Sequence, residues 1–182
     1  MNLIFLLEER SMKEVLDIIL PKILPGEVTF ITIPHNGKSD LEASIPKKLK
    51  SWNQPNTKFV IIRDQDSGDC VDVKQKLKEL SSPYNRDVLI RIACRELESW
   101  YFGDLEAVSA AYGKDVAKLS QKSKYRVPDR IGNPKDELKK LIPKHQQIDG
   151  ARKIAVHMDI ARNTSESFKC FVSGVKRLCN TD

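Results

Sequence analysis

Hydrophobic positions in the first ninety residues alternate between two periods. Continuous apolar or β-branched runs, typical of buried parallel strands, occupy residues 3–7, 28–33, 58–62 and 88–93. Apolar residues at helical spacing lie between them and predict helices at residues 11–23, 39–52 and 71–80. This β-α-β-α-β-α-β order predicts an α/β fold, a parallel four-stranded sheet flanked by helices.

Polar residues at the helix starts suggest where each helix begins. Ser11 is the expected N-cap of the first helix and Ser39 or Asp40 that of the second, while Asp69 is a candidate cap for the third. Pro46 lies inside the second predicted helix and is expected to kink it.

The second half of the chain has a different pattern. We expect a single domain over residues 1–182, with a β/α core at 1–94 and a mostly helical, basic extension at 95–182. Within the extension, the pattern predicts a helix at 95–112, a long loop at 113–134 and a final amphipathic helix at 165–179. A further helix is expected to start at Asn133, with Pro134 in its first turn.

Composition narrows the class of protein. The chain is 40% hydrophobic and 31% charged, which fits a folded soluble domain. It has no apolar stretch near the roughly 20 residues of a membrane span, and its N-terminus lacks the features of a signal peptide, so a cytoplasmic protein is expected. No CxxC pair occurs, which favours free thiols over a zinc site for Cys70, Cys94, Cys170 and Cys179.

Positive charge is concentrated in one part of the chain. The formal net charge is +6, yet residues 114–153 alone hold 12 basic and 5 acidic side chains, a local net of +7. Such an excess suits a polyanionic partner such as nucleic acid, although a lysine-rich solvated surface would have the same composition.

Acidic residues follow three of the four predicted strands. They are Glu8 and Glu9 after the first strand, Asp64, Asp66 and Asp69 after the third, and Glu96 and Glu98 after the fourth. Because parallel strands end at one edge of a sheet, we expect these carboxylates to lie close together and to repel one another unless a cation neutralises them. Such oxygen ligands suit Mg²⁺ or Mn²⁺, whereas helix capping is the alternative role for any single one of them.

The Asp64–Asp69 segment partly resembles two other motifs. An EF-hand loop fails because Gly68 is the fifth residue and Gln75 stands where the loop needs a glutamate. An aspartyl phosphatase would use Asp64 as nucleophile and Asp66 as acid or base, but such enzymes carry this motif on the first strand. An aspartyl phosphatase is therefore an alternative to the metal site.

The order of an apolar strand, a glutamate and a helix, followed later by a strand and DxDxxG, resembles the Toprim domain of topoisomerases, primases and OLD-family nucleases. Glu8 matches the Toprim glutamate, and Asp64 and Asp66 match its DxD motif. The chain departs from that pattern at Glu9, where glycine is common, and at Gly68, which comes one position early.

Over most of its length the chain is more similar to a bacterial family, the domain of unknown function 4276, which is thought to be Toprim-like. The segments that carry this resemblance are residues 7–11, 33–40, 63–70, 95–104 and 150–155. The resemblance implies a Toprim-like fold, an ABC- or AAA-type ATPase encoded nearby as a partner, and a role in phage defence or DNA repair.

The Toprim resemblance further implies a nuclease that hydrolyses phosphodiester bonds with one or two divalent ions. Glu8, Asp64 and Asp66 would bind the first ion, Glu96 and Glu98 a second, and Asp69 would bridge or bind through water. If a helix begins by Arg95, only one of Glu96 and Glu98 can be a ligand, and Glu98 is favoured.

Cations near the reacting phosphate are also expected. The candidates for contacting nucleic acid are Lys38, Arg95, Arg152 and Lys153, with Lys153 also a candidate catalytic residue. His35 is either a proton carrier or a turn residue, and Trp100 either a core residue or a base-stacking platform. The competing function is a non-catalytic metal- or nucleic-acid-binding subunit of an ATPase.

Overall fold

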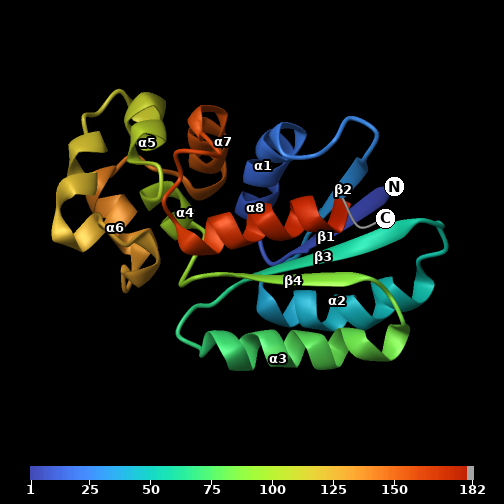
Figure 1. The fold of residues 1–182 in the computed structure, drawn as a ribbon. Coiled ribbons are helices and arrows are strands. Elements are labelled where there is room, and N and C mark those ends of the chain that lie inside the picture. The colour runs from blue at the N-terminus through green and yellow to red at the C-terminus, as the bar shows by residue number, and fades with distance from the viewer. Residues whose placement is uncertain (180–182) are drawn as a thin grey trace.

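In the computed structural model, which describes residues 1–179, the chain forms an α/β fold around a four-stranded, all-parallel sheet (Figure 1). The strands are β1 (Asn2–Leu7), β2 (Thr29–Pro34), β3 (Thr57–Asp64) and β4 (Val88–Ala93), in the order β2-β1-β3-β4. The register pairs Leu7 with both Pro34 and Ile62, and Asp64 with Ala93, so all four strands end at one edge. The predicted fold class is confirmed.

Alternation along the strands gives the sheet two apolar faces. One face packs on α2 (Lys38–Ser51) and α3 (Cys70–Ser81), which lie below the sheet in Figure 1. Leu3, Phe5 and Leu7 of the central strand point to the other face. That face is covered by α1 (Arg10–Ile19) and by helices from the second half of the chain.

The second half is mostly helical. It contains α4 (Glu98–Phe102), α5 (Leu105–Tyr112), α6 (Pro134–Leu141), α7 (Gln147–His157) and α8 (Glu166–Cys179). Short 3₁₀ helices are η1 (Leu20–Lys22), η2 (Ser82–Tyr84), η3 (Ala117–Gln121), η4 (Ser123–Tyr125) and η5 (Pro128–Arg130). The last three lie in the segment predicted to be a long loop. The sequence pattern did not predict α7.

The helix predicted at 95–112 is in fact two helices. Asp104 leaves the helical conformation, and its side chain accepts a hydrogen bond from the Ala107 N–H, which makes it the N-cap of α5. The same carboxylate also pairs with Arg162, so tertiary contacts favour this break.

Other predicted helix starts differ in detail. Glu9, not Ser11, occupies the N-cap position of α1, and Gly37, with φ of 89°, precedes α2 in place of Ser39 or Asp40. The predicted cap at Asp69 is confirmed, since its side chain accepts hydrogen bonds from two N–H groups in the first turn of α3. Pro46 lies inside α2 without ending it.

Trp100 is a core residue, so base stacking on it is ruled out. Its ring is 0% exposed, stacks on Phe171 and donates a hydrogen bond from Nε1 to Ser167 Oγ at 3.0 Å. Among the described residues, no helix is both long enough and apolar enough to span a membrane. The four cysteines are free thiols.

Candidate active site at the carboxyl edge of the sheet

The parallel strands bring the predicted acidic residues to one edge. Glu8 directly follows β1, Asp64 is the last residue of β3, and Glu98 is the first residue of α4, a short helix that begins after β4. Glu8 is 8% exposed and its Oε2 accepts a hydrogen bond from the Asp64 N–H at 3.0 Å. This bond joins the ends of two neighbouring strands and fixes the direction of the Glu8 carboxylate.

Burial and mutual repulsion perturb these carboxyls. Burial raises the pKa of Asp64 well above its usual value, and the negative charges of Glu98, Glu8 and Glu9 raise it further. Burial also raises the pKa of Glu98 to about 7, and Glu96 and Glu9 contribute to that shift. Burial also raises the pKa of Glu8, and the hydrogen bond from the Asp64 N–H offsets part of that shift. The site is therefore a cluster of interacting carboxyls that a cation would stabilise.

Tyr101 lies beside this cluster. It follows Glu98 by three residues on α4, which places both on one face of the helix. Burial raises the pKa of the Tyr101 hydroxyl well above its usual value, and the charges of Glu98 and Asp64 add to the shift. Its Oη is buried and has no hydrogen-bond partner among residues 1–179. Tyr101 thus holds a spare donor close to two candidate ligands.

An open cleft of about 210 Å³ adjoins the buried carboxyls. Asp66, Arg95, Glu96 and Asn133 are among the residues that line it. Asp66 and Arg95 both adopt positive φ, 55° and 61°. The Asp66 N–H donates to the Arg95 carbonyl at 2.7 Å, and the Arg95 N–H donates to Gln65 Oε1 at 3.1 Å. These bonds tie the loops after β3 and β4 together, so that an acidic and a basic side chain share one cleft.

Arg63 is a buried cation that lies between Glu8 and Glu42. It is 7% exposed, its Nη1 donates to Glu42 Oε1 at 2.7 Å, and its Nε lies 3.8 Å from Glu8 Oε2. Lys76 pairs with the other oxygen of Glu42 at 2.7 Å. Arg63 therefore offsets part of the negative charge at Glu8.

Glu9 connects the sheet edge to the second half of the chain. Its Oε2 accepts a hydrogen bond from Gln147 Nε2, at the start of α7, at 2.5 Å. A cavity of about 10 Å³ lies between Glu8, Glu9 and Asp64, roughly the space that one water molecule needs. The cavity is thus about the size of one water molecule and is lined by three carboxylates.

Two predicted ligands have other contacts. Asp69 is exposed and uses Oδ1 to cap α3, and Glu96 Oε2 accepts a hydrogen bond from the Lys135 N–H at 3.0 Å. These bonds give both carboxylates structural roles at the start of a helix.

Two of the four predicted cations form ion pairs with residues outside the cluster. Arg152 forms a two-pronged ion pair with Glu14 of α1, and Lys153 pairs with Asp149 on its own helix at 2.7 Å. Lys38 is an exposed residue at the start of α2. Arg95 is the predicted cation that lines the acidic cleft.

The sequence interpretation missed Arg63, Tyr101 and Gln147. A charged residue within the apolar run 59–63 was a usable signal for Arg63, and the three-residue spacing from Glu98 was one for Tyr101. Gln147 had no local signal, because it reaches Glu9 through tertiary packing. His35 Nδ1 lies 2.8 Å from the Leu7 carbonyl, a turn contact.

No group of three or more His, Cys, Asp or Glu side chains within residues 1–179 is arranged to hold a metal ion as the side chains stand. The carboxylates at this edge are close enough to shift one another's pKa, yet they do not converge on one point. Binding an ion would therefore require side-chain rotation.

Comparison with known proteins identifies a family but no function. The family model described as "Domain of unknown function (DUF4276)" matches residues 7–176. No curated protein and no solved structure matches the chain.

Proposed function

The chain belongs to the DUF4276 family, a domain of unknown function, and this description assigns no activity. From the site, we propose that the protein is a divalent-metal-dependent nuclease that hydrolyses phosphodiester bonds of nucleic acid. The observation that carries the proposal is that the charges of Glu8 and Glu98 both act on Asp64, so that carboxyls from the ends of β1 and β3 and from the start of α4 lie together. A relationship to the Toprim domain, based on Glu8 and the Asp64–Asp66 motif, is part of this proposal.

The donor set fits Mg²⁺ or Mn²⁺. Glu8, Asp64 and Asp66 would hold the first ion, and Glu98 would serve a second or complete the first, because all four offer hard oxygen ligands at one sheet edge. A bound ion would stabilise the developing negative charge on the attacking and leaving oxygens of a phosphodiester. Asp69 and Glu96 would hold the two flanking helices in place through their backbone hydrogen bonds.

The protein's own groups would assist the reaction in three ways. The Asp64 N–H and Arg63 orient the Glu8 carboxylate and offset part of the burial that raises its pKa. If Glu8, Asp64 and Asp66 alone hold the ion, Glu98, with a pKa of about 7, can exchange a proton near neutral pH, as an acid or base for the reacting oxygens requires. Arg95 lines the open cleft next to Asp66 and can face the non-bridging phosphate oxygens.

The second candidate function is a non-catalytic metal- or nucleic-acid-binding subunit. The observation that favours its nucleic-acid-binding form, which needs no metal, is that no three-residue metal group is preformed among residues 1–179. In either case we propose that an ABC- or AAA-type ATPase is the partner protein and that the pair acts in phage defence or DNA repair.

A cleavage assay tests the proposal. Purified protein with Mg²⁺ or Mn²⁺ should cut supercoiled plasmid or labelled single strands, and Asp64→Asn plus Asp66→Asn should abolish cutting. A matched control, Glu27→Gln plus Asp87→Asn, removes two exposed carboxylates that precede β2 and β4 at the opposite, amino edge of the sheet, and should cut like the wild type. Binding without cutting, even with the ATPase added, would identify the non-catalytic subunit instead.

A further inference from the structure

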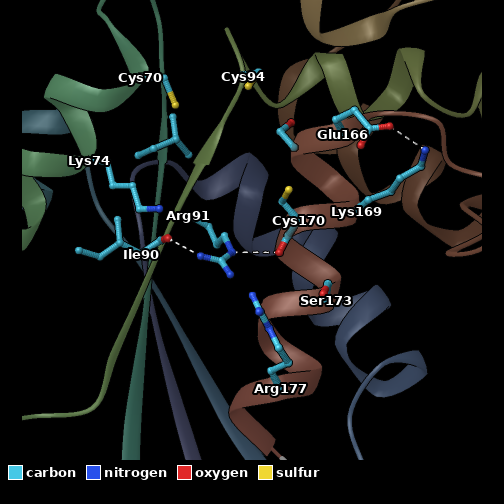
Figure 2. Close-up of a pocket in the computed structure, with 12 residues that line it drawn as sticks. Cys70, Lys74, Ile90, Arg91, Cys94, Glu166, Lys169, Cys170, Ser173 and Arg177 are labelled. Carbon is cyan, nitrogen blue, oxygen red and sulfur yellow. Dashed lines mark hydrogen bonds and ion pairs between the residues drawn. The ribbon is translucent and has the colours of Figure 1, made fainter.

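A groove of about 610 Å³ runs beside β4, between α3 and α8 (Figure 2). One wall is formed by Cys70 and Lys74 of α3, the floor by Ile90 and Arg91 of β4, and the other wall by α8 as far as Arg177. None of the site residues predicted from the sequence lines this groove.

The floor of the groove is the free edge of the sheet, since β4 is the last strand in the order. Ala93 and Asp87 direct their carbonyls to the β3 side, where they accept from Gln65 and Phe59, so the intervening even-numbered residues direct theirs outward. Arg91 covers this edge, because its Nη1 donates to the outward Ile90 carbonyl at 2.9 Å. An added β-strand is thereby disfavoured.

Hydrogen bonds to two backbone carbonyls fix the position of the Arg91 guanidinium. Its Nε donates to the Cys170 carbonyl of α8 at 3.0 Å, so two backbone carbonyls fix the planar group between the edge strand and the helix (Figure 2). Gly174 makes this possible, because a Cβ at that position would overlap the guanidinium. Glycine inside a helix costs about 1 kcal/mol relative to alanine, which the α8 sequence accepts at this position.

The groove carries excess positive charge. Lys74, Arg91 and Arg177 have no carboxylate partner among residues 1–179, while Lys169 is paired with Glu166 at 2.9 Å, the one acidic residue in the lining. Burial, together with the nearby Arg177, lowers the pKa of Arg91, as expected for cations brought together without a counter-ion.

One end of the groove is lined by residues that are next in the chain to two residues of the acidic edge. Cys70 directly follows Asp69 on the loop after β3, and Cys94 directly precedes Arg95 on the loop after β4. A ligand lying in the groove would therefore extend from Cys70 and Cys94 along β4 toward Arg177, at the last turn of α8.

We propose that this groove binds the phosphodiester backbone of a nucleic-acid strand and guides it to or from the carboxyl edge of the sheet. The proposal rests on the proposed nuclease function and specifies where its substrate lies. Guanidinium and ammonium groups without counter-ions can bind successive phosphates of the backbone. A peptide strand would instead need to pair with the Ile90 carbonyl, to which Arg91 already donates.

The test is a binding measurement in EDTA, which is independent of metal and of cleavage. Fluorescence anisotropy with a labelled single strand of about 12 nucleotides, and with a duplex of the same sequence, compares the wild type with Lys74→Gln plus Arg177→Gln. The control is Lys47→Gln plus Lys50→Gln, which removes the same charge from α2, outside the groove. Urea midpoints check that both variants are folded.

The groove variant should bind about tenfold more weakly than the wild type and the control. Its salt dependence on single strands should fall by about 1.4 in log–log slope, since each phosphate contact contributes about 0.7. Equal affinity of the two variants, or no binding by the wild type, would overturn the proposal. So would a polyglutamate peptide that binds through Lys74 and Arg177 when the oligonucleotide does not, which would indicate an acidic protein partner.

Failure of this proposal is separable from failure of the nuclease proposal. Asp64→Asn plus Asp66→Asn should abolish cleavage while leaving binding in EDTA intact or stronger, because it removes negative charge near the strand. If cleavage depends on those carboxylates and the groove variant binds normally, only the groove assignment is wrong. If the wild type binds through the groove and never cuts, only the nuclease assignment is wrong.

Discussion

Glu8 Oε2 accepts a hydrogen bond from the Asp64 backbone N–H at 3.0 Å, across the ends of β1 and β3. The bond follows from the strand register, which pairs Leu7 with Ile62 and so sets the residue after β1 beside the end of β3. It holds one buried carboxylate next to another whose pKa is raised. Carboxyls held together in this way destabilise the folded protein when they are ionised, which makes the site sensitive to pH and to cations.

The first prediction concerns the pH dependence of stability. The pKa of Glu98 is about 7 in the folded protein against an ordinary 4.5, so the folded state binds this proton more tightly than the unfolded state. The resulting stabilisation is complete below about pH 4.5 and is lost as the pH rises through 7. From this residue alone, the free energy of unfolding should fall by up to about 3 kcal/mol between pH 5 and 8.

Urea unfolding of Glu98→Gln at several pH values checks this. The variant should be more stable than the wild type at pH 8. Its free energy of unfolding should fall much less between pH 5 and 8 than that of the wild type. Glu79→Gln, which removes an exposed carboxyl of α3, should keep the wild-type pH profile. An unchanged slope in Glu98→Gln would contradict the assignment of the shift to this residue.

The second prediction concerns metal binding. A divalent cation competes with protons for Asp64 and Glu98, so Mn²⁺ should raise the melting temperature more at pH 8 than at pH 6. At about 100 times its dissociation constant the ion contributes about 2.7 kcal/mol, or roughly 5 to 10 °C for a chain of this size. Asp64→Asn plus Asp66→Asn should lose this response.

Asp69→Asn is the informative control for that experiment. Asparagine also caps helices, so α3 should keep its start and the protein its stability. If Asp69 is only a cap, the Mn²⁺ shift will equal that of the wild type. A loss of the shift in Asp69→Asn would restore Asp69 to the set of metal ligands.

The third prediction concerns the break between α4 and α5. Asp104 is 2% exposed, caps α5, accepts the Asp159 N–H at 2.9 Å and pairs with Arg162 at 2.8 Å. Asp104→Ala removes the N-cap of α5 and leaves the buried Ala107 N–H and the part-buried Asp159 N–H unpaired, so it should cost about 2 to 4 kcal/mol in urea unfolding. Asp115→Ala, which breaks an exposed pair with Lys118, should cost less than about 1 kcal/mol. Similar costs for the two variants would show that the buried network contributes little.

Local sequence patterns predicted the sheet better than the second half of the chain. Runs such as residues 58–62 are apolar on both sides because helices cover both faces of the sheet, and this signal is local. The boundary at Asp104 instead depends on Arg162 and Asp159, more than fifty residues away. The pattern at 95–112 therefore predicted one helix where there are two. The sequence pattern also failed to predict α7.

The acidic edge was predictable in outline only. Parallel topology brings Glu8, Asp64 and Glu98 together, as expected from residues that follow strands. Which of the acidic residues accept structural hydrogen bonds was not predictable, because this depends on which backbone N–H groups lie near each carboxylate. Glu96 accepts from the start of α6, a helix almost forty residues later in the chain. The cations of α7 likewise pair with Glu14 and Asp149, which composition alone cannot show.

The fourth prediction separates function from stability at Tyr101. Its hydroxyl is buried without a hydrogen-bond partner among the described residues, so Tyr101→Phe should leave the free energy of unfolding unchanged or raise it by about 1 kcal/mol. Under the proposed function this donor lies beside Asp64 and Glu98, and its loss should slow cleavage by about tenfold or more.

Tyr125→Phe is the matched control, since the Tyr125 hydroxyl donates to Glu137 Oε1 at 2.5 Å in the basic extension. That variant should lose about 1 to 2 kcal/mol of stability, because a bond to a charged acceptor is removed, while its cleavage rate stays at the wild-type level. Urea unfolding and initial cleavage rates on both variants give the two readouts. A Tyr101→Phe protein that is destabilised but cuts normally would show that this hydroxyl serves packing rather than the reaction, since an orphaned donor kept at an active site should cost stability and contribute rate.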